Sequence, residues 1–366
     1  EAHSSGRECH PYTVIGGQLA ELWERGDVGP DDTFVAPASA VPCLLRQYGD
    51  GYRIAQTRAG ADGPAVLDVV SGELDRLIGL SGLLHYYEGL AACELLMTLA
   101  RRVRPYAVDP DAPLAVEDGW MREVEEALAR VRPIRPLLAE AAAEIWSLPR
   151  RGRPGDLPVV GVTGDLYTRF HQAGNAHLFD RLESLGVEVW LSPYFATSSQ
   201  FSEVADRARW RSRSELKRTA ASLLAGATAE RLYRAMTRAL PEDAAPLVTE
   251  PRPEEIYRRA VRYSGPRSSW LQLLTVGKLV DFLERGAAGA LSVAGVNCMV
   301  GTAVAGAIPA VRRDHRGAPV LSLTYGGAEG PAQRIRLETF AHQVCHRGSN
   351  GGRSDGRGSG VGREAL

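Results

Sequence analysis

The sequence predicts an α/β protein made of two flavodoxin- or Rossmann-like lobes, with a parallel sheet in each lobe, helical insertions and a cleft between the lobes. The prediction rests on two strand–helix–strand patterns and on long segments of helical spacing around them. A strand that is joined through a helix to the next strand forms a parallel pair with it. Two such units, each flanked by helices, therefore indicate a parallel sheet in each half of the chain.

The clearest of these units lies near the C-terminus. Residues 290–296 form an apolar run of strand length, residues 302–313 carry small and apolar residues at helical spacing, and residues 318–323 are the next strand. Cys298 comes just after the first of these strands, at the edge where open parallel sheets bind ligands. This position makes Cys298 a candidate for chemistry; the alternative is a small, buried, inert thiol.

The second unit carries polar side chains after its first strand. Its strand, helix and returning strand are expected over 159–162, 175–185 and 187–191. The candidate substrate-binding residues of the connecting loop are Asp165, Tyr167, Arg169 and Asn175. An arginine pairs with phosphate or carboxylate groups and a helix start binds anions, whereas an internal ion pair and a helix cap are the alternative roles. The sequence contains neither the dinucleotide-binding glycine pattern nor a P-loop.

A charged segment with glycine and proline, residues 150–156, marks the boundary between the lobes. The N-terminal lobe covers residues 1–150 and the C-terminal lobe residues 151–346. Residues 347–366 have a low-complexity composition that predicts a disordered tail. Outside the two units we expect a strand over 31–36 and helices over 14–24, 76–104, 120–148 with a break near Pro133 and Pro136, 203–240, 253–263, 270–285 and 333–345.

The composition is that of an ordinary soluble globular protein. With 43 basic and 44 acidic residues, the chain has no overall charge that would attract nucleic acid or an anionic membrane. No apolar run approaches the ~20 residues of a membrane span, and no signal-peptide pattern occurs. The five cysteines are scattered without disulfide-like spacing, which favours a reducing, cytoplasmic setting. The chain begins with Glu1 rather than Met, so we expect it to be part of a longer polypeptide.

Three of the cysteines follow strand-like runs or precede helices. Cys9 lies at a loop-to-helix boundary, where helix N–H groups favour a thiolate, and Cys43 follows the expected strand over 31–36. Together with Cys298 they would meet in the cleft if each lies on the carboxyl edge of its sheet. Three thiolates from distant loops suit an iron–sulfur cluster with one open iron, a three-cysteine zinc site, or no metal at all.

The other cysteines receive no role. Cys93 falls within a long helical pattern and is expected in the core, and Cys345 lies at the start of the low-complexity tail. A nucleophilic cysteine paired with His10 or His171 has no local signature in the sequence.

Six short motifs occur in one order along the chain. They are Arg-Glu-Cys-His-Pro at 7–11, Pro-Cys-Leu-Leu-Arg-Gln-Tyr at 42–48, Gly-Asp-Leu-Tyr-Thr-Arg at 164–169 with Asn175, Leu182-Glu183 with Gly186, Asn-Cys-Met-Val-Gly at 297–301, and Arg336-Leu337-Glu338 with Phe340. In these motifs the chain resembles the 2-hydroxyacyl-CoA dehydratase and benzoyl-CoA reductase D-component superfamily. It is most similar to the dehydratase-like C-terminal module of the CoA-substrate-specific enzyme activase proteins, over about residues 5–345.

The resemblance implies an iron–sulfur protein. It assigns Cys9, Cys43 and Cys298 to a [4Fe–4S] cluster or, as in some relatives, to a double-cubane [8Fe–9S] cluster. It further implies low-potential electrons supplied by an ATP-driven activase, which would be a separate chain or a preceding part of the polypeptide. The electron acceptor would be an acyl-CoA or another small substrate. The protein would act as a dehydratase-like lyase or as a reductase component, and it would form a homodimer.

Two other functions are compatible with the same residues. One is a non-catalytic module, a cluster-bearing electron relay or assembly surface within a larger activase. The other is a scaffold without a cluster, because the chain departs from the family pattern at Arg46 and Val300. The chain also has Tyr-Gly-Gly at 325–327, where the family usually has an aspartate. This difference bears on the predicted substrate pocket more than on the predicted cluster ligands.

Overall fold

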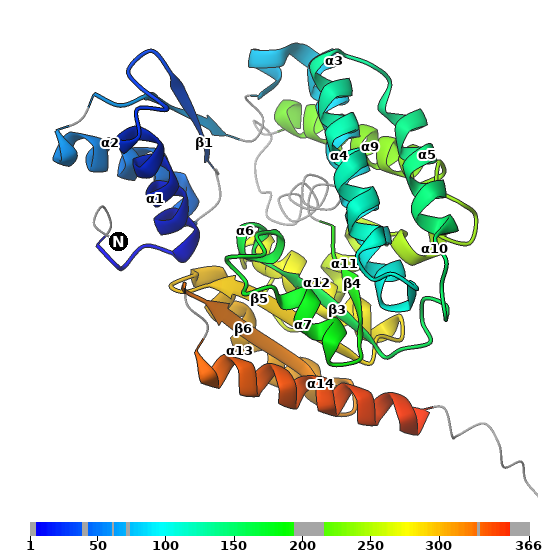
Figure 1. The fold of residues 1–366 in the computed structure, drawn as a ribbon. Coiled ribbons are helices and arrows are strands. Elements are labelled where there is room, and N and C mark those ends of the chain that lie inside the picture. Colours follow the sequence, from blue (N-terminus) through cyan, green and yellow to red (C-terminus); the bar gives the residue numbers. More distant parts are fainter. Residues whose placement is uncertain are drawn as a thin grey trace, which may run out of the picture.

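The computed structural model describes residues 5–38, 43–60, 62–70, 74–193, 216–327 and 330–351. It confirms the expected α/β class, with a two-stranded parallel sheet near the N-terminus and a four-stranded parallel sheet in the second half (Figure 1). A helical bundle stands beside the larger sheet. None of the helices in the described part is long and apolar enough to cross a membrane.

The larger sheet has the strand order β4-β3-β5-β6. Its strands are β3 (Val159–Gly164), β4 (Glu188–Leu191), β5 (Gly289–Gly295) and β6 (Val320–Tyr325), and all neighbouring pairs are parallel. The chain runs from β3 outward to β4 and then returns to the other side of β3 for β5. The order therefore reverses between β3 and β5, and ligands bind beyond the carboxyl ends of the strands at such a point.

Helices cover both faces of this sheet and bury its apolar strands. On one face lie α7 (Leu178–Ser184) and α14 (Pro331–Gly351), and on the other α12 (Trp270–Glu284) and α13 (Met299–Asp314). The short α6 (Leu166–Phe170) follows β3, and α11 (Pro253–Ala260) packs against α12. Helix α14 extends to Gly351, so the expected tail is helical over 347–351, and residues 352–366 lie outside the described residues.

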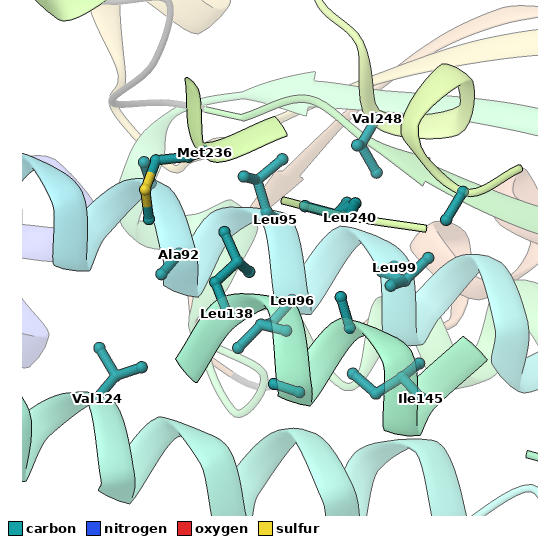
Figure 2. Close-up of a cluster of buried hydrophobic side chains, with 14 of the residues drawn as sticks. Ala92, Leu95, Leu96, Leu99, Val124, Leu138, Ile145, Met236, Leu240 and Val248 are labelled. Atoms are coloured by element: carbon teal, nitrogen blue, oxygen red, sulfur yellow. The ribbon is translucent and has the colours of Figure 1, made fainter. Parts of the chain in front are cut away.

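The helical bundle has its own hydrophobic core. It contains α3 (Leu74–Val103), α4 (Ala112–Ala129), α5 (Ile134–Ser147), α9 (Leu216–Thr237) and α10 (Ala245–Val248). Figure 2 shows that α3 packs on two sides, with Leu96 toward Leu138 of α5 and Leu95 toward Leu240. The predicted break near Pro133 is confirmed, because proline cannot continue the helix, and it separates α4 from α5.

The bundle core also crosses the boundary expected from the sequence. Helices α9 and α10 lie after residue 150 and nevertheless pack against α3. The predicted helix over 203–240 corresponds to α9 from Leu216 onward, and its earlier part lies outside the described residues.

Ion pairs join the bundle to the large sheet. Arg102 Nε lies 2.5 Å from Glu188 Oε1 at the start of β4, and the Tyr106 hydroxyl of η2 (Arg104–Tyr106) donates to Glu188 Oε2 at 2.6 Å. Arg101 Nη1 contacts Asp180 of α7 at 2.9 Å. Glu188 is fully buried, so removing its partners would leave an uncompensated charge in the interior.

The N-terminal sheet is small and surrounded by short helices. Its order of elements is α1 (His10–Glu24), β1 (Thr33–Ala38), η1 (Leu44–Gln47), α2 (Tyr48–Ala59) and β2 (Ala65–Val70). The strand expected over 31–36 is confirmed as β1, and its partner β2 and the helix α2 were not expected. Tyr12, Tyr48 and Tyr52 fill the core between α1 and α2, and the rings of Tyr12 and Tyr52 stack at 4.8 Å.

Candidate functional site

Cys298 lies where the sequence predicts, beyond the carboxyl end of β5. It is the N-cap of α13, and its Sγ accepts a hydrogen bond from the Gly301 backbone N–H at 3.3 Å. The helix begins close to the strand because residue 301 has no side chain: a Cβ there would lie 2.4 Å from the Ala294 Cβ. Helix α13 therefore starts at Met299, earlier than the sequence suggested, and directs its free N–H groups toward the sheet edge.

Cys9 lies at the same edge because the start of the chain packs on the end of β5. Cys9 is the N-cap of α1, and the next residue, His10, donates its backbone N–H to the Val296 carbonyl at 3.0 Å. At Gly295 a Cβ would lie 2.7 Å from the Pro11 Cδ, so glycine permits this approach. Residues 9 and 298, near opposite ends of the sequence, are thereby brought to one place.

The Asn297 side chain reinforces this packing. Its Nδ2 donates to the carbonyl oxygens of Gly6 at 3.2 Å and Glu8 at 3.1 Å. Asn297 has a positive φ of 63°, a conformation that asparagine adopts more readily than most residues. Asn297, which precedes Cys298, is therefore hydrogen-bonded to Glu8, which precedes Cys9.

Cys43 completes the group from the N-terminal lobe. It is the N-cap of η1, and Tyr48 at the start of α2 follows that short helix. The Tyr48 hydroxyl lies 2.6 Å from the Cys9 Sγ. All three predicted cysteines therefore occupy N-cap positions. Cys9 and Cys298 lie at the edge of the large sheet, and Cys43 lies near enough to act electrostatically on both of their thiols.

Burial and mutual repulsion oppose ionisation of these thiols. Burial raises the pKa of Cys9, and negative charge on Cys43 and on Asp165 raises it further, against the hydrogen bond from Tyr48. Burial raises the pKa of Cys298 to about 11, with smaller contributions from Asp165, Cys43 and Cys9. The partial positive charge at the helix N-termini does not by itself bring the pKa of Cys9 or Cys298 back down. A bound cation would, because metal ligation deprotonates a thiol outright.

Asp165 is the predicted loop residue that the structure brings to the cysteines. Asp165 follows β3, whereas Cys298 follows β5, and the strand order reverses between these two strands. The Asp165 backbone N–H donates to the Val293 carbonyl of β5 at 2.9 Å. Its carboxylate caps α6 by accepting from the N–H groups of Tyr167 and Thr168, both at 3.1 Å. Burial raises the pKa of Asp165, and its charge in turn acts on Cys9 and Cys298.

Asn175 has an internal role in the structure. Its Nδ2 donates to the carbonyls of Thr168 at 2.9 Å and Arg169 at 3.1 Å, and its Oδ1 accepts from the Leu178 N–H at 3.1 Å. Only 1% of the residue is exposed. Asn175 therefore fixes the turn between α6 and α7, and substrate binding by its side chain stays a prediction.

Tyr167 and Arg169 both lie in the interior of this loop. The Tyr167 ring stacks on His171 with centroids 4.7 Å apart, and its hydroxyl is buried without a hydrogen-bond partner among the described residues. Arg169 is buried, with its guanidinium carbon 4.7 Å from the centroid of the Phe170 ring. A substrate role for these two side chains also stays a prediction.

The sequence analysis assigned no role to Tyr48 or Asn297, although both belong to the motifs at 42–48 and 297–301. Tyr48 also lines a surface pocket of about 370 Å³ together with Glu8, Tyr12 and Leu44, among others. The Tyr48 side chain therefore extends from this pocket to the Cys9 sulfur. The only feature of the sequence that points to Tyr48 is its place in the same motif as Cys43. The sequence does not reveal that its hydroxyl contacts the sulfur of Cys9 instead.

The remaining cysteines pack elsewhere. Cys93 is partly buried against the bundle core, where burial raises its pKa to about 11, and the Cys345 Sγ contacts the Leu185 carbonyl at 3.8 Å. Among the residues that the structure describes, no three His, Cys, Asp or Glu side chains are placed as ligands of a single metal ion.

Comparison with known proteins adds no relative: no family model, no curated protein and no solved structure matches this chain.

Proposed function

We propose that this chain is an iron–sulfur protein of the 2-hydroxyacyl-CoA dehydratase type, which passes low-potential electrons to an acyl-CoA-like or other small substrate. One observation carries the proposal. Cys9, Cys43 and Cys298 come from distant parts of the sequence, occupy the N-cap positions of three different helices, and are near enough for the charges of Cys9 and Cys43 to act on the Cys298 thiol at the end of β5. That edge is the carboxyl end of β5 next to the reversal of strand order, where this fold class binds its ligands.

The donor set fits a cluster with three protein ligands. A [4Fe–4S] cluster is held by cysteine thiolates, and three of them leave one iron open to a substrate or a small ligand. The three thiols at this site repel one another when ionised, so a cationic centre would be stabilised by all three. A double-cubane [8Fe–9S] cluster uses the same chemistry. When bound, the cluster would supply one-electron transfer at a potential set by its surroundings.

The protein residues bind, orient and shield this centre. Cys9 is 7% exposed, so water is largely excluded from its sulfur. Asn297 and the contact between His10 and Val296 fix Cys9 relative to Cys298. The Gly301 N–H contributes a hydrogen bond to a sulfur at the start of a long helix, an arrangement that favours negative charge on sulfur.

The proposal includes partners that follow from the resemblance. The electrons would come from an ATP-driven activase, either as a separate chain or as another part of a longer polypeptide. The protein would act in the cytoplasm as a homodimer. Its activity would be that of a dehydratase-like lyase or a reductase component.

A second function, a non-catalytic electron relay or assembly module, is favoured by the loop after β3. Asn175 uses its side-chain donors internally, and Asp165 caps α6. The side chains of Asp165 and Asn175 therefore already make hydrogen bonds within the chain. A relay would need the cysteine centre and would not need a pocket for coenzyme A.

Metal analysis of cysteine variants tests the proposal. We expect about four iron and four acid-labile sulfide per chain after anaerobic purification or reconstitution, or about eight iron for a double-cubane cluster. Serine at position 9, 43 or 298 should abolish or strongly reduce loading, whereas Cys93→Ser and Cys345→Ser should load like the wild type. Zinc alone, or no metal in a folded wild-type protein, would overturn the proposal.

Binding of acyl-CoA separates the two functions once the cluster is established. Calorimetric titration of the loaded protein with a series of acyl-CoA thioesters should show saturable binding if the chain is of the dehydratase type. A loaded protein that binds none of them would support the relay.

A further inference from the structure

We infer that Tyr48 is a positioning residue that sets the reduction potential of the cysteine centre by donating its phenolic hydrogen bond to the Cys9 sulfur. The inference rests on the proposed function and deepens it. The Tyr48 Oη and the Cys9 Sγ are 2.6 Å apart. Both side chains are nearly inaccessible, with Tyr48 5% and Cys9 7% exposed, so water does not replace this contact.

The direction of the hydrogen bond follows from the chemistry of the two groups. A thiolate that ligates a metal has no hydrogen to donate and can only accept. A tyrosine hydroxyl carries one hydrogen and donates readily. In the loaded protein Tyr48 is therefore the donor and Cys9 the acceptor, and a hydrogen bond to a charged acceptor is stronger than one between neutral groups.

The aromatic cluster around Tyr48 holds the hydroxyl in place. The Tyr12 ring meets the Tyr48 ring edge to face at 5.3 Å, and the Tyr52 ring does so at 6.1 Å. Tyr52 is also 2% exposed, but its hydroxyl is directed to the Tyr12 carbonyl at 3.5 Å rather than to a sulfur. The two tyrosines share one core and differ in what their hydroxyl groups contact.

A hydrogen-bond donor at the Cys9 sulfur favours the reduced state of the cluster. Reduction adds one electron, supplied in a titration by an external reductant such as dithionite, and increases the negative charge on the sulfurs. No bond between heavy atoms forms or breaks in this step. A hydrogen bond to a sulfur stabilises the more negative state and raises the potential, the more so where the surroundings are dry. Tyr48 would therefore keep the potential within the range of its electron donor.

The test compares Tyr48→Phe with Tyr52→Phe. Both variants remove one buried hydroxyl from the same cluster, and only the first removes the contact to sulfur. Iron and sulfide are measured first, and the midpoint potential is then determined by anaerobic redox titration followed by electron paramagnetic resonance. We expect Tyr48→Phe to load like the wild type and to be harder to reduce, with a reduction equilibrium constant lowered about tenfold, or about 59 mV for one electron. Tyr52→Phe should keep the wild-type potential.

The outcomes separate this inference from the proposed function. A loaded Tyr48→Phe protein with the wild-type potential would overturn the role of Tyr48 and leave the cluster in place. Wild-type protein without iron and sulfide after reconstitution would overturn both.

A second measurement covers a Tyr48→Phe variant that does not load. The reduced wild-type and Tyr52→Phe proteins, transferred to deuterium oxide, should show an exchangeable deuteron coupled to the cluster in pulsed electron paramagnetic resonance. If neither shows such a coupling, Tyr48 does not donate to the centre and the inference fails.

Discussion

Asn297 donates through its side-chain amide to the Glu8 carbonyl at 3.1 Å. The two residues are the immediate neighbours of Cys298 and Cys9, so this hydrogen bond, together with the one from the His10 N–H to the Val296 carbonyl, holds the two candidate ligands near each other. It joins the start of the chain to the end of a core strand of the large sheet. The geometry of the site therefore depends on a contact outside the cysteines themselves.

Replacing Asn297 should loosen the segment around Cys9. In Asn297→Asp the donor is lost while a residue that tolerates positive φ is kept. We expect the contact to weaken by about 1 kcal/mol, the usual contribution of one hydrogen bond, which corresponds to roughly fivefold faster amide exchange at His10. Hydrogen-exchange mass spectrometry of the peptide over 6–14 measures this. Asn297→Ala should exchange faster still, because alanine adds backbone strain, and wild-type exchange in both variants would contradict the assignment.

Asn175→Asp should destabilise the protein strongly. The substitution replaces an amide that donates to two carbonyls with a carboxylate that repels both, in a residue that is 1% exposed. Loss of two donors and burial of a charge should cost about 3 kcal/mol or more, visible as a lower midpoint of urea unfolding. Asn175→Ala removes the bonds without adding a charge and should cost less. An unchanged midpoint combined with a loss of ligand binding would instead favour the substrate role predicted from the sequence.

Lys278 is expected to be essential for folding stability. It is fully buried on α12, with its Nζ 2.6 Å from Glu250 and 2.8 Å from Asp281, and both carboxylates are nearly inaccessible. Lys278→Met should lower the free energy of unfolding by about 3–5 kcal/mol, because it leaves two buried carboxylates without their shared cation. Arg234→Ala, which breaks an exposed ion pair with Glu230, should cost about 1 kcal/mol or less. Urea denaturation followed by circular dichroism compares the two variants, and equal losses would contradict this prediction.

Glu117 on α4 should make the stability depend on pH. Burial raises the pKa of Glu117 to about 7, and its Oε2 is buried without a hydrogen-bond partner among the described residues. The folded protein thus favours the protonated acid, and folding loses stability as the pH rises from the ordinary carboxyl pKa through 7.

The matched variant is Glu117→Gln, which removes this titration. At pH 8 it should be more stable than the wild type by about 1–3 kcal/mol, and the difference should vanish as the pH falls toward 4.5. Thermal unfolding at both pH values measures the effect, and a pH-independent difference for Glu117→Gln would contradict it.

The sequence predicts the large sheet well because its strands are buried on both faces. Residues 290–296 are apolar except for Ser292, and the structure places β5 there. The small residues after Cys298 predicted a helix but not its start, since that depends on how closely Gly301 approaches Ala294. The sequence did not predict α2, because its first turn contains Gly49, Asp50 and Gly51, a pattern typical of a turn.

The site could be predicted in its ligand types and only partly in its surroundings. The placement of cysteines after strands and before helices predicted that Cys9, Cys43 and Cys298 would lie near one another, and the structure places Cys9 and Cys298 at the same sheet edge. The contact of Tyr48 with Cys9 joins residues 39 positions apart, and that of Asn297 with Glu8 joins residues 289 positions apart. Neither contact leaves a periodic pattern in the sequence. The first depends on how α1 and α2 pack around the tyrosine cluster, and the second depends on how the start of the chain packs on the end of β5. The same holds for Asn175, whose internal bonds involve a turn that forms only when α6 and α7 are in place.

The position of Cys298 so late in the chain has a consequence for biosynthesis. Cys9 and Cys43 are made at least 255 residues before Cys298, and the sheet edge on which Cys9 packs does not exist until β5 and the start of α13 have been made. Chain elongation at ~5–20 residues per second leaves the first two thiols waiting for many seconds. They are exposed to oxidation during that interval, because a nascent chain does not bury them. A metal centre held by all three thiols could therefore be completed only after Cys298 has been made.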